Sequence, residues 1–168
     1  MCRSGEIISP SRPRVRPNLH AVGRSRLPSH YDRRMARALK VLVYSDNADT
    51  RQEIMLALGR RPSRELPEVE YVEVATEPVV IRTADAGALD LLILDGEAAP
   101  AGGMGVCRQL KDELYAGPPI LVLVGRSQDA WLATWSRADA VVSRPLDPRA
   151  FAEAVTDLLR PRVAVDRA

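Results

Sequence analysis

Short apolar runs alternate with helical patterns from residue 40 to residue 160. Three of the runs carry apolar residues on both faces, as strands buried on both sides do. One run alternates apolar and polar positions, which is typical of an edge strand. The predicted strands are 40–44, 69–74 (the alternating one), 91–94, 120–124 and a brief strand at 140–142.

Helical periodicity fills the intervals between these strands. Asp49 is expected to open a helix that places Ile54 and Leu58 on one face. The predicted helices are 49–58, 76–87 (with Pro78 at its first position), 104–114, 130–135 and a last one opened by Asp147. Five strand–helix units predict an α/β fold with a five-stranded, doubly wound parallel sheet between two helical layers. Ligands of such sheets bind beyond the carboxyl ends of the strands.

Composition narrows the class of protein. The chain has 168 residues, 24 basic against 22 acidic ones, and 46% apolar residues, enough to bury a core. Two cysteines and the absence of a long apolar run argue against a disulfide scaffold, a signal peptide and a membrane span, so the cytoplasm is the expected location. Both histidines lie in the first 34 residues, which argues against imidazole catalysis or a zinc site in the domain.

The first residues differ from the rest. Residues 1–34 hold eight arginines, two acidic residues and four prolines without periodicity, and are expected to be disordered in isolation. The predicted division is a basic arm at 1–37, a domain at 38–161 and a tail at 162–168. The arm could bind an anionic surface or nucleic acid, could wedge into a protein partner, or could reflect a start upstream of the true one at Met35. No DNA-binding domain is expected after Arg160, and nucleic acid is not the expected partner.

Acidic side chains follow two of the predicted strands. Asp46 comes after the first strand, and Asp95 and Glu97 come after the third. Because the carboxyl ends of parallel strands share one edge of the sheet, these three carboxylates are expected to form an acidic pocket. The other residues at these corners are Ser45, Val124, Gly125, Val141, Arg144 and Pro145.

These corners resemble the receiver domain of two-component response regulators, a CheY-like domain with the flavodoxin-like fold. The resemblance covers residues 39–160. It implies that Asp95 stands at the phosphoacceptor position, that Asp46 is one member of the acidic pair, and that Pro145 follows a cis peptide bond. It further implies Mg²⁺ held by Asp46 and Asp95, a sensor kinase as partner, and an output surface on the fourth helix, fifth strand and fifth helix.

The sequence departs from the family pattern at the remaining switch positions. Ser45 replaces the second acid, Val124 and Gly125 stand where a hydroxyl is usual, Val141 replaces an aromatic residue, and Arg144 replaces lysine. Phosphoryl transfer needs a metal and a cation to neutralise charge, and signalling needs a bistable element. The departures therefore predict an atypical receiver, or pseudo-receiver, with weak Mg²⁺ binding, no resident cofactor and little or no phosphorylation.

Arg144 is also expected to pair permanently with Asp95 or Glu97, since a guanidinium fork suits a carboxylate and stays charged. The preferred function is a non-enzymatic regulatory or interaction module. The alternatives are a working phosphoacceptor in a phosphorelay, an accessory subunit of a larger complex, and a small hydrolase or nucleotide-binding enzyme. The accessory role follows from similarity to single-domain receiver-like proteins of actinobacteria, some of which accompany the proton-pumping NADH dehydrogenase, and would bring the chain to a membrane only through that partner.

Trp131 and Trp135 are the candidate docking residues. They lie four positions apart and therefore share one stripe of the predicted fourth helix. Inward packing is favoured for one ring, because Leu132 alone is a small inner face. At least one ring is expected to be exposed in the isolated protein, as an anchor that a protein partner covers. The loop at 61–68 is the next candidate.

Overall fold

The computed structural model describes residues 37–114, 116–129, 131 and 135–165. Five strands form one sheet in the order β2-β1-β3-β4-β5, and every paired strand is parallel. The strands are β1 (Leu39–Tyr44), β2 (Val69–Val74), β3 (Leu91–Asp95), β4 (Ile120–Val124) and β5 (Ala140–Ser143). This arrangement confirms the predicted parallel sheet, with the alternating strand β2 at one edge.

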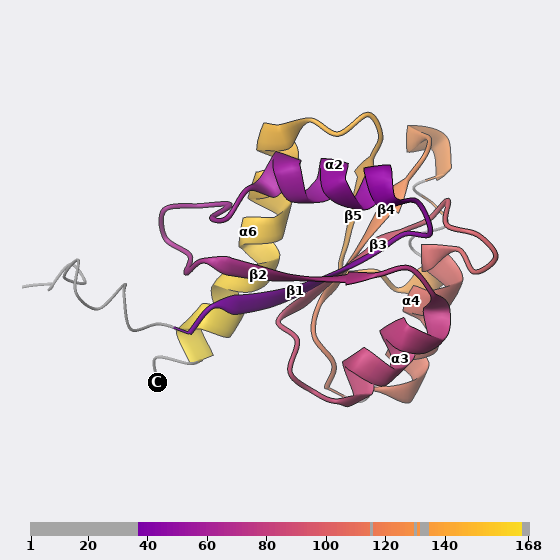
Figure 1. Cartoon of the computed structure of the whole chain (residues 1–168), viewed down its shortest axis with the longest axis horizontal. Helices are drawn as coiled ribbons and strands as arrows, with labels where there is room; N and C mark the ends of the chain where they lie inside the picture. The colour runs from indigo at the N-terminus through magenta and orange to yellow at the C-terminus, as the bar shows by residue number, and fades with distance from the viewer. Residues whose placement is uncertain (1–36, 115, 130, 132–134, 166–168) are drawn as a thin grey trace, which may run out of the picture.

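Helices cover both faces of the sheet (Figure 1). Helices α2 (Ala48–Leu58) and α6 (Pro148–Val165) lie on one face, and α3 (Glu77–Asp85) and α4 (Gly103–Glu113) lie on the other. A short 3-10 helix, η1 (Ser127–Asp129), follows β4. The predicted helix at 130–135 falls largely outside the described residues, of which Trp131 and Trp135 remain.

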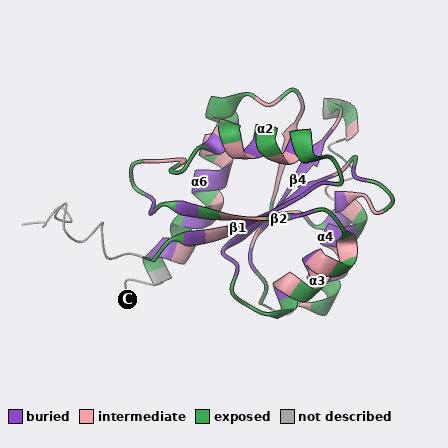
Figure 2. Cartoon of the chain, viewed as in Figure 1, coloured by how far each residue is buried: buried purple, intermediate pink, exposed green. Residues whose placement is uncertain are grey.

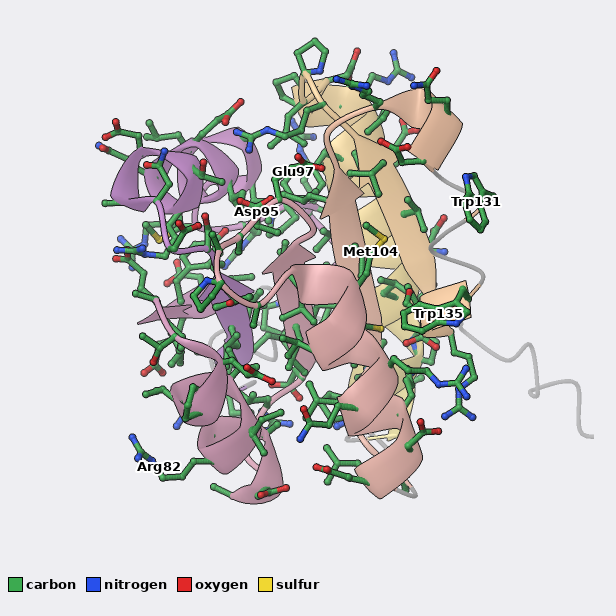
Figure 3. All side chains as sticks on the ribbon, turned by 90° about the vertical axis from the view of Figure 1, so that its right-hand side faces the viewer. Arg82, Asp95, Glu97, Met104, Trp131 and Trp135 are labelled. Carbon is green, nitrogen blue, oxygen red and sulfur yellow. The ribbon has the colours of Figure 1, made fainter. Side chains whose placement is uncertain are left out.

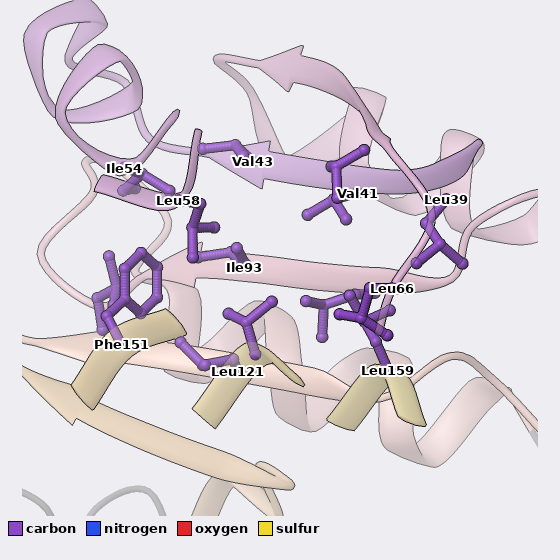
Figure 4. Packing of buried hydrophobic residues seen from close by; sticks show 14 of the residues in the cluster. Leu39, Val41, Val43, Ile54, Leu58, Leu66, Ile93, Leu121, Phe151 and Leu159 are labelled. Carbon is purple, nitrogen blue, oxygen red and sulfur yellow. The ribbon is translucent and has the colours of Figure 1, made fainter. Parts of the chain in front are cut away.

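Two apolar clusters hold the three layers together, and the buried residues concentrate on the central strands (Figure 2). Alternate residues of each central strand point to opposite clusters, as the pleat of a strand dictates. On the α2/α6 side, Phe151 and Leu159 of α6 pack with Ile93 and Leu121 of the sheet (Figure 4). On the α3/α4 side, both helices pack against the strand residues that alternate with those of the first cluster.

Helix ends differ slightly from the expected ones. Helix α2 begins at Ala48, and its N-cap is Asn47, whose side-chain oxygen accepts a hydrogen bond from the Asp49 amide. Asparagine can take this position, two residues before Asp49, because it caps as well as aspartate does. Asp147 caps α6 as expected, by accepting from two backbone amides. Helix α6 continues to Val165, so the predicted domain end at 161 falls within it.

Parallel pairing brings the carboxyl ends of β1, β3, β4 and β5 to one edge of the sheet. Tyr44 of β1 is level with Leu94 of β3, and Asp95 is level with Leu123 of β4. The loops that follow these strands therefore meet around Asp95. The described parts of the chain contain no helix long and apolar enough to cross a membrane.

Candidate functional site

Asp95 is the last residue of β3, and its side chain is 4% exposed. The Ser45 hydroxyl donates a hydrogen bond to Asp95 Oδ2 at 2.8 Å, and the Glu97 amide donates to Asp95 Oδ1 at 3.0 Å. The Ser45 hydroxyl in turn accepts from the Asn47 amide at 3.1 Å. Both oxygens of this carboxylate are thus held by donors of the chain itself.

Arg144 is the first residue after β5. The next peptide bond, Arg144–Pro145, is cis, as predicted. The Arg144 guanidinium forms an ion pair with Glu53 of α2 and donates to the Thr50 hydroxyl at 3.4 Å. Only a longer approach, 4.0 Å from Nη1 to Oδ2, joins it to Asp95.

The expected pair of Arg144 with Asp95 is thus present at this longer distance, whereas Glu53 is the nearer partner and Glu97 forms no ion pair with Arg144 among the described residues. Glu53 is the main partner, because α2 presents it directly to the loop after β5, and its carboxylate is more accessible than the buried Asp95. A sequence signal for this contact existed. Thr50 and Glu53 are three residues apart, so they share the face of α2 that looks toward the site.

Glu97 and Gly125 are packed against each other. A side chain's first carbon at Gly125 would lie 3.0 Å from both Cδ and Oε1 of Glu97. A side chain at position 125 would thus press on the Glu97 carboxyl group, which would have to shift by a few tenths of an ångström. It has no ion-pair partner within the described residues, and Figure 3 shows it beside Asp95.

The Tyr44 hydroxyl lies in a negative electrostatic field at this edge of the sheet. Burial raises the pKa of this hydroxyl, and the charges of Glu77, Asp46 and Asp95 raise it further. The hydroxyl donates to the Ala101 carbonyl at 2.6 Å. Tyr44 was not singled out from the sequence, where it reads as a strand residue, yet it links β1 to the loop that follows β3.

The remaining switch positions line the same edge. Val124 is buried, Val141 is half-buried beside the α3/α4 cluster, and Pro145 is exposed. None of the three carries a polar side chain, so none can hydrogen-bond to a group attached to Asp95. Asp46 is exposed.

The oxygens at this edge suit Mg²⁺, which is commonly held by one or two carboxylates with water completing its shell. Asp46 and Asp95 would hold it, and it would neutralise charge that develops on a phosphoryl group. The fit is loose, since Asp95 Oδ2 already accepts from Ser45 and no group of three potential ligands forms among the described residues.

Both tryptophans are exposed, Trp131 at 68% and Trp135 at 56%. The expectation of at least one exposed ring is confirmed, whereas the inward packing expected for one of the two rings is wrong. Ser136, the residue after Trp135, is buried, and its carbonyl accepts from the Cys107 thiol of α4 at 3.3 Å. Arg108 of α4 lies over the Trp135 ring at 5.9 Å from its centroid, and Arg108 Nη1 donates to the Trp135 carbonyl at 3.1 Å.

The chain is similar in fold to solved structures of response regulators. The chain superimposes on chemotaxis response regulator CheY4 of Vibrio cholerae with a TM-score of 0.61 and 18% identity, over 73% of this chain and 100% of that one. It superimposes on response regulator DrrB of Thermotoga maritima with a TM-score of 0.59 and 17% identity, over 75% of this chain and 54% of that one. At such identities the likeness shows the fold: a CheY-like, flavodoxin-like receiver.

Sequence relatives carry the assignment further, although no family model matches the chain. Response regulatory proteins MT3230 and Rv3143, from the CDC 1551 / Oshkosh and H37Rv strains of Mycobacterium tuberculosis, are each 59% identical over 123 residues, which is 73% of this chain and 92% of theirs. The chain belongs to the response regulator family, whose receiver domains work in two-component signalling.

Proposed function

We propose that this receiver acts as a regulatory docking module and that Asp95 takes up little or no phosphate. The observation that carries the proposal is the set of contacts around Asp95. Ser45 and the Glu97 amide donate to its two oxygens, while the nearby cation, Arg144, is shared between Glu53 and a longer ion pair with Asp95. A phosphoryl group would need these donors and this cation for itself.

The residues that would transmit phosphorylation of Asp95 to the rest of the domain also lack the groups needed for this. Val124, Gly125 and Val141 offer neither a hydroxyl nor an aromatic ring to report a change at Asp95. A modification alters a protein only when it biases an element with two arrangements. These residues support constitutive docking rather than docking switched by phosphate.

The docking surface in this proposal is the tryptophan face, which we define as Trp131, Trp135 and Arg108. Two exposed indoles beside a guanidinium form the kind of aromatic and arginine cluster that anchors protein interfaces. Figure 3 places both rings at the periphery of the molecule, away from Asp95. A protein partner that carries an apolar patch would bury them.

A working phosphoacceptor is the second candidate, and Asp95 at the end of β3 with Asp46 after β1 favours it. A sensor kinase would then be the partner. The accessory role with an NADH dehydrogenase rests on the resemblance alone, since the relatives' names contain no such reference. A hydrolase or nucleotide-binding activity has no support beyond the shared fold.

Phosphate uptake is tested by intact mass after incubation with acetyl phosphate and Mg²⁺, with Asp95→Ala as the control. We expect no Asp95-dependent mass increase in the wild-type chain. Stoichiometric labelling within minutes, absent from Asp95→Ala, would establish the second candidate instead.

Docking is tested by alanine substitution on the tryptophan face. Trp131→Ala and Trp135→Ala should each remove most of the binding to the protein that photo-crosslinks to this face, because exposed indoles bury large areas on association. The melting temperature should stay nearly unchanged. Leu56→Ala is the matched control, since Leu56 is 74% exposed on α2. Equal loss of binding in all three variants would place the docking surface elsewhere.

A further inference from the structure

We propose that Asp112 of α4 is a positioning residue of the tryptophan face, because its carboxylate holds two arginines that fix Trp135 before a partner arrives. The inference rests on the proposed function, since it concerns the surface that docking would use. It names a residue outside the tryptophan face that strengthens docking by ordering one of the two rings. The contacts between α4 and residues 135–137, which lead toward β5, carry the inference.

Asp112 accepts hydrogen bonds from two guanidinium groups at once. Arg108 Nε donates to Asp112 Oδ2 at 3.0 Å, and Arg137 Nη2 donates to Asp112 Oδ1. One oxygen thus binds an arginine of the same helix, and the other binds an arginine 25 positions further along the chain. Asp112 therefore joins α4 to the segment that carries Trp135.

Arg108 passes this connection on to Trp135 through two contacts. Its Nη1 donates to the Trp135 carbonyl at 3.1 Å, and its Cζ lies 5.9 Å from the centroid of the ring, which Figure 3 shows beside α4. A guanidinium over an indole is attracted by the face of the ring. Because Asp112 binds Nε and the Trp135 carbonyl binds Nη1, the guanidinium is held from two sides in its place over the ring.

The backbone of the segment also depends on α4. Arg137 has a φ of 59°, in the left-handed region that favours glycine, and its side chain supplies the second ion pair of Asp112. Between Arg137 and Trp135, the buried Ser136 accepts from the Cys107 thiol of α4 through its carbonyl. Each of the three residues 135–137 is therefore bound to α4.

The network orders the surface more than it stabilises the fold. The side chains of Arg108, Asp112 and Arg137 are 40%, 52% and 47% exposed, and ion pairs this exposed contribute little to the free energy of unfolding. An exposed ring that is not held changes rotamer within nanoseconds, and a partner must immobilise it at a cost in affinity. A ring that is already held avoids part of this cost, so Asp112 should affect docking more than unfolding.

The experiment measures the fluorescence anisotropy decay of Trp135 in the full chain. Every sample carries Trp131→Phe, so that Trp135 is the single remaining indole. Asp112→Asn keeps the shape of the side chain and removes its charge, and the amplitude of the sub-nanosecond depolarisation should become about twofold larger. Glu113→Gln is the matched control, because Glu113 is exposed, makes the same change in charge and accepts from Gln109 of α4 itself. It should leave the decay unchanged.

Arg137→Gly separates a positioning role from a structural one. It removes the second arginine but places glycine where φ is positive, so the melting temperature should stay within about two degrees while the motion of the ring increases as in Asp112→Asn. Sodium chloride at about 1 M should increase this motion more when Asp112 is present than in Asp112→Asn, because salt screens exposed ion pairs. Ring motion that stays unchanged in Asp112→Asn and Arg137→Gly overturns the inference.

The protein that photo-crosslinks to the tryptophan face provides the docking measurement. With both tryptophans in place, Asp112→Asn should bind it about fivefold more weakly than the wild type, and Glu113→Gln should bind it equally well. Equal affinity of the three chains overturns the inference, whatever the motion of the ring. Docking that survives both Trp131→Ala and Trp135→Ala overturns the proposed function instead, whereas the anisotropy decay, which needs no partner, still decides whether Asp112 orders Trp135.

Discussion

Two buried aspartates lie at opposite ends of β3, and different groups of the chain stabilise their charges. Asp90, just before the strand, accepts a two-pronged pair of hydrogen bonds from Arg37 at 2.7 and 2.8 Å and a third from the Lys40 amide. Asp95, at the strand's end, is held by a serine hydroxyl and a backbone amide, and its closest guanidinium nitrogen is 4.0 Å away. Both side chains are almost fully buried.

The difference separates a structural carboxylate from a functional one. At Asp90 the charge is neutralised by a direct ion pair with Arg37, which joins the segment before β1 to the start of β3. At Asp95 neutral donors hold the carboxylate at short distance, and its ion pair with Arg144 is long because that guanidinium lies closer to Glu53. The first arrangement favours stability, and the second leaves a buried charge at the functional edge of the sheet.

The largest expected effect is the loss of the Asp90 pair. Arg37→Ala should lower the free energy of unfolding by about 2 to 3 kcal/mol, because it leaves a buried charge without its partner. The value lies below that of a fully buried pair because the Arg37 side chain is 55% exposed. Urea unfolding measures it, with the exposed Arg82→Ala as the control. Equal stability of the two variants would show that the pair contributes nothing.

Acid should act through the same carboxylate. Burial on its own would raise the pKa of Asp90, but hydrogen bonds from Arg37 and the Lys40 amide and the charges of Arg37 and Arg162 outweigh it and lower the pKa below 3.8. This contribution is complete above the unfolded pKa near 3.9 and is lost as the pH falls through the folded pKa.

Asp90→Asn should therefore be less stable than the wild type at pH 7, and the difference should shrink as the pH falls below about 4. Urea titrations at a series of pH values measure this. A difference that stays constant from neutral pH to pH 2 would contradict the role of this charge.

A smaller effect is expected at the other end of the strand. Arg144→Ala should destabilise the protein by about 1 kcal/mol, because the ion pair with Glu53 ties α2 to the loop after β5 but is partly exposed. Arg149→Ala removes an exposed pair within α6 and should cost less. A loss for Arg144→Ala as large as that for Arg37→Ala would mean that the two ends of β3 are equally dependent on their arginines.

The smallest effect concerns the N-terminal residues. A chain that begins at Met35 keeps Arg37, and its melting temperature should stay within about two degrees of the full-length value. A chain that begins at residue 38 should lose as much stability as Arg37→Ala does. A large loss already at Met35 would show that residues before 35 stabilise the domain.

The sheet could be predicted because its central strands are continuous apolar runs, and pattern alone identifies such strands. The corner at Asp95 could be predicted because parallel strands align their ends. The Arg37–Asp90 pair could not, since Arg37 lies within the range assigned to the basic arm and its partner is 53 residues away.

Side-chain contacts at the site could be predicted only in part. The spacing of Thr50 and Glu53 places them on one face of α2, but only the placement of α2 brings Glu53 closer than Asp95 to Arg144. The contact of Glu97 with Gly125 depends on how two loops approach each other, and the absence of a side chain at a glycine gives no sign of what fills the space. At least one of Trp131 and Trp135 was expected to be exposed, and both are, so the inward packing expected for one ring is absent.

The placement of the tryptophans has a spectroscopic consequence. They are the only two in the chain, and both belong to the tryptophan face. Indole emission excited at long wavelength therefore arises from one patch and is already red-shifted by water in the folded state. Unfolding will change the wavelength of maximum emission little. A partner that covers the tryptophan face will shift this wavelength to the blue, so intrinsic fluorescence can detect partner binding without an added label.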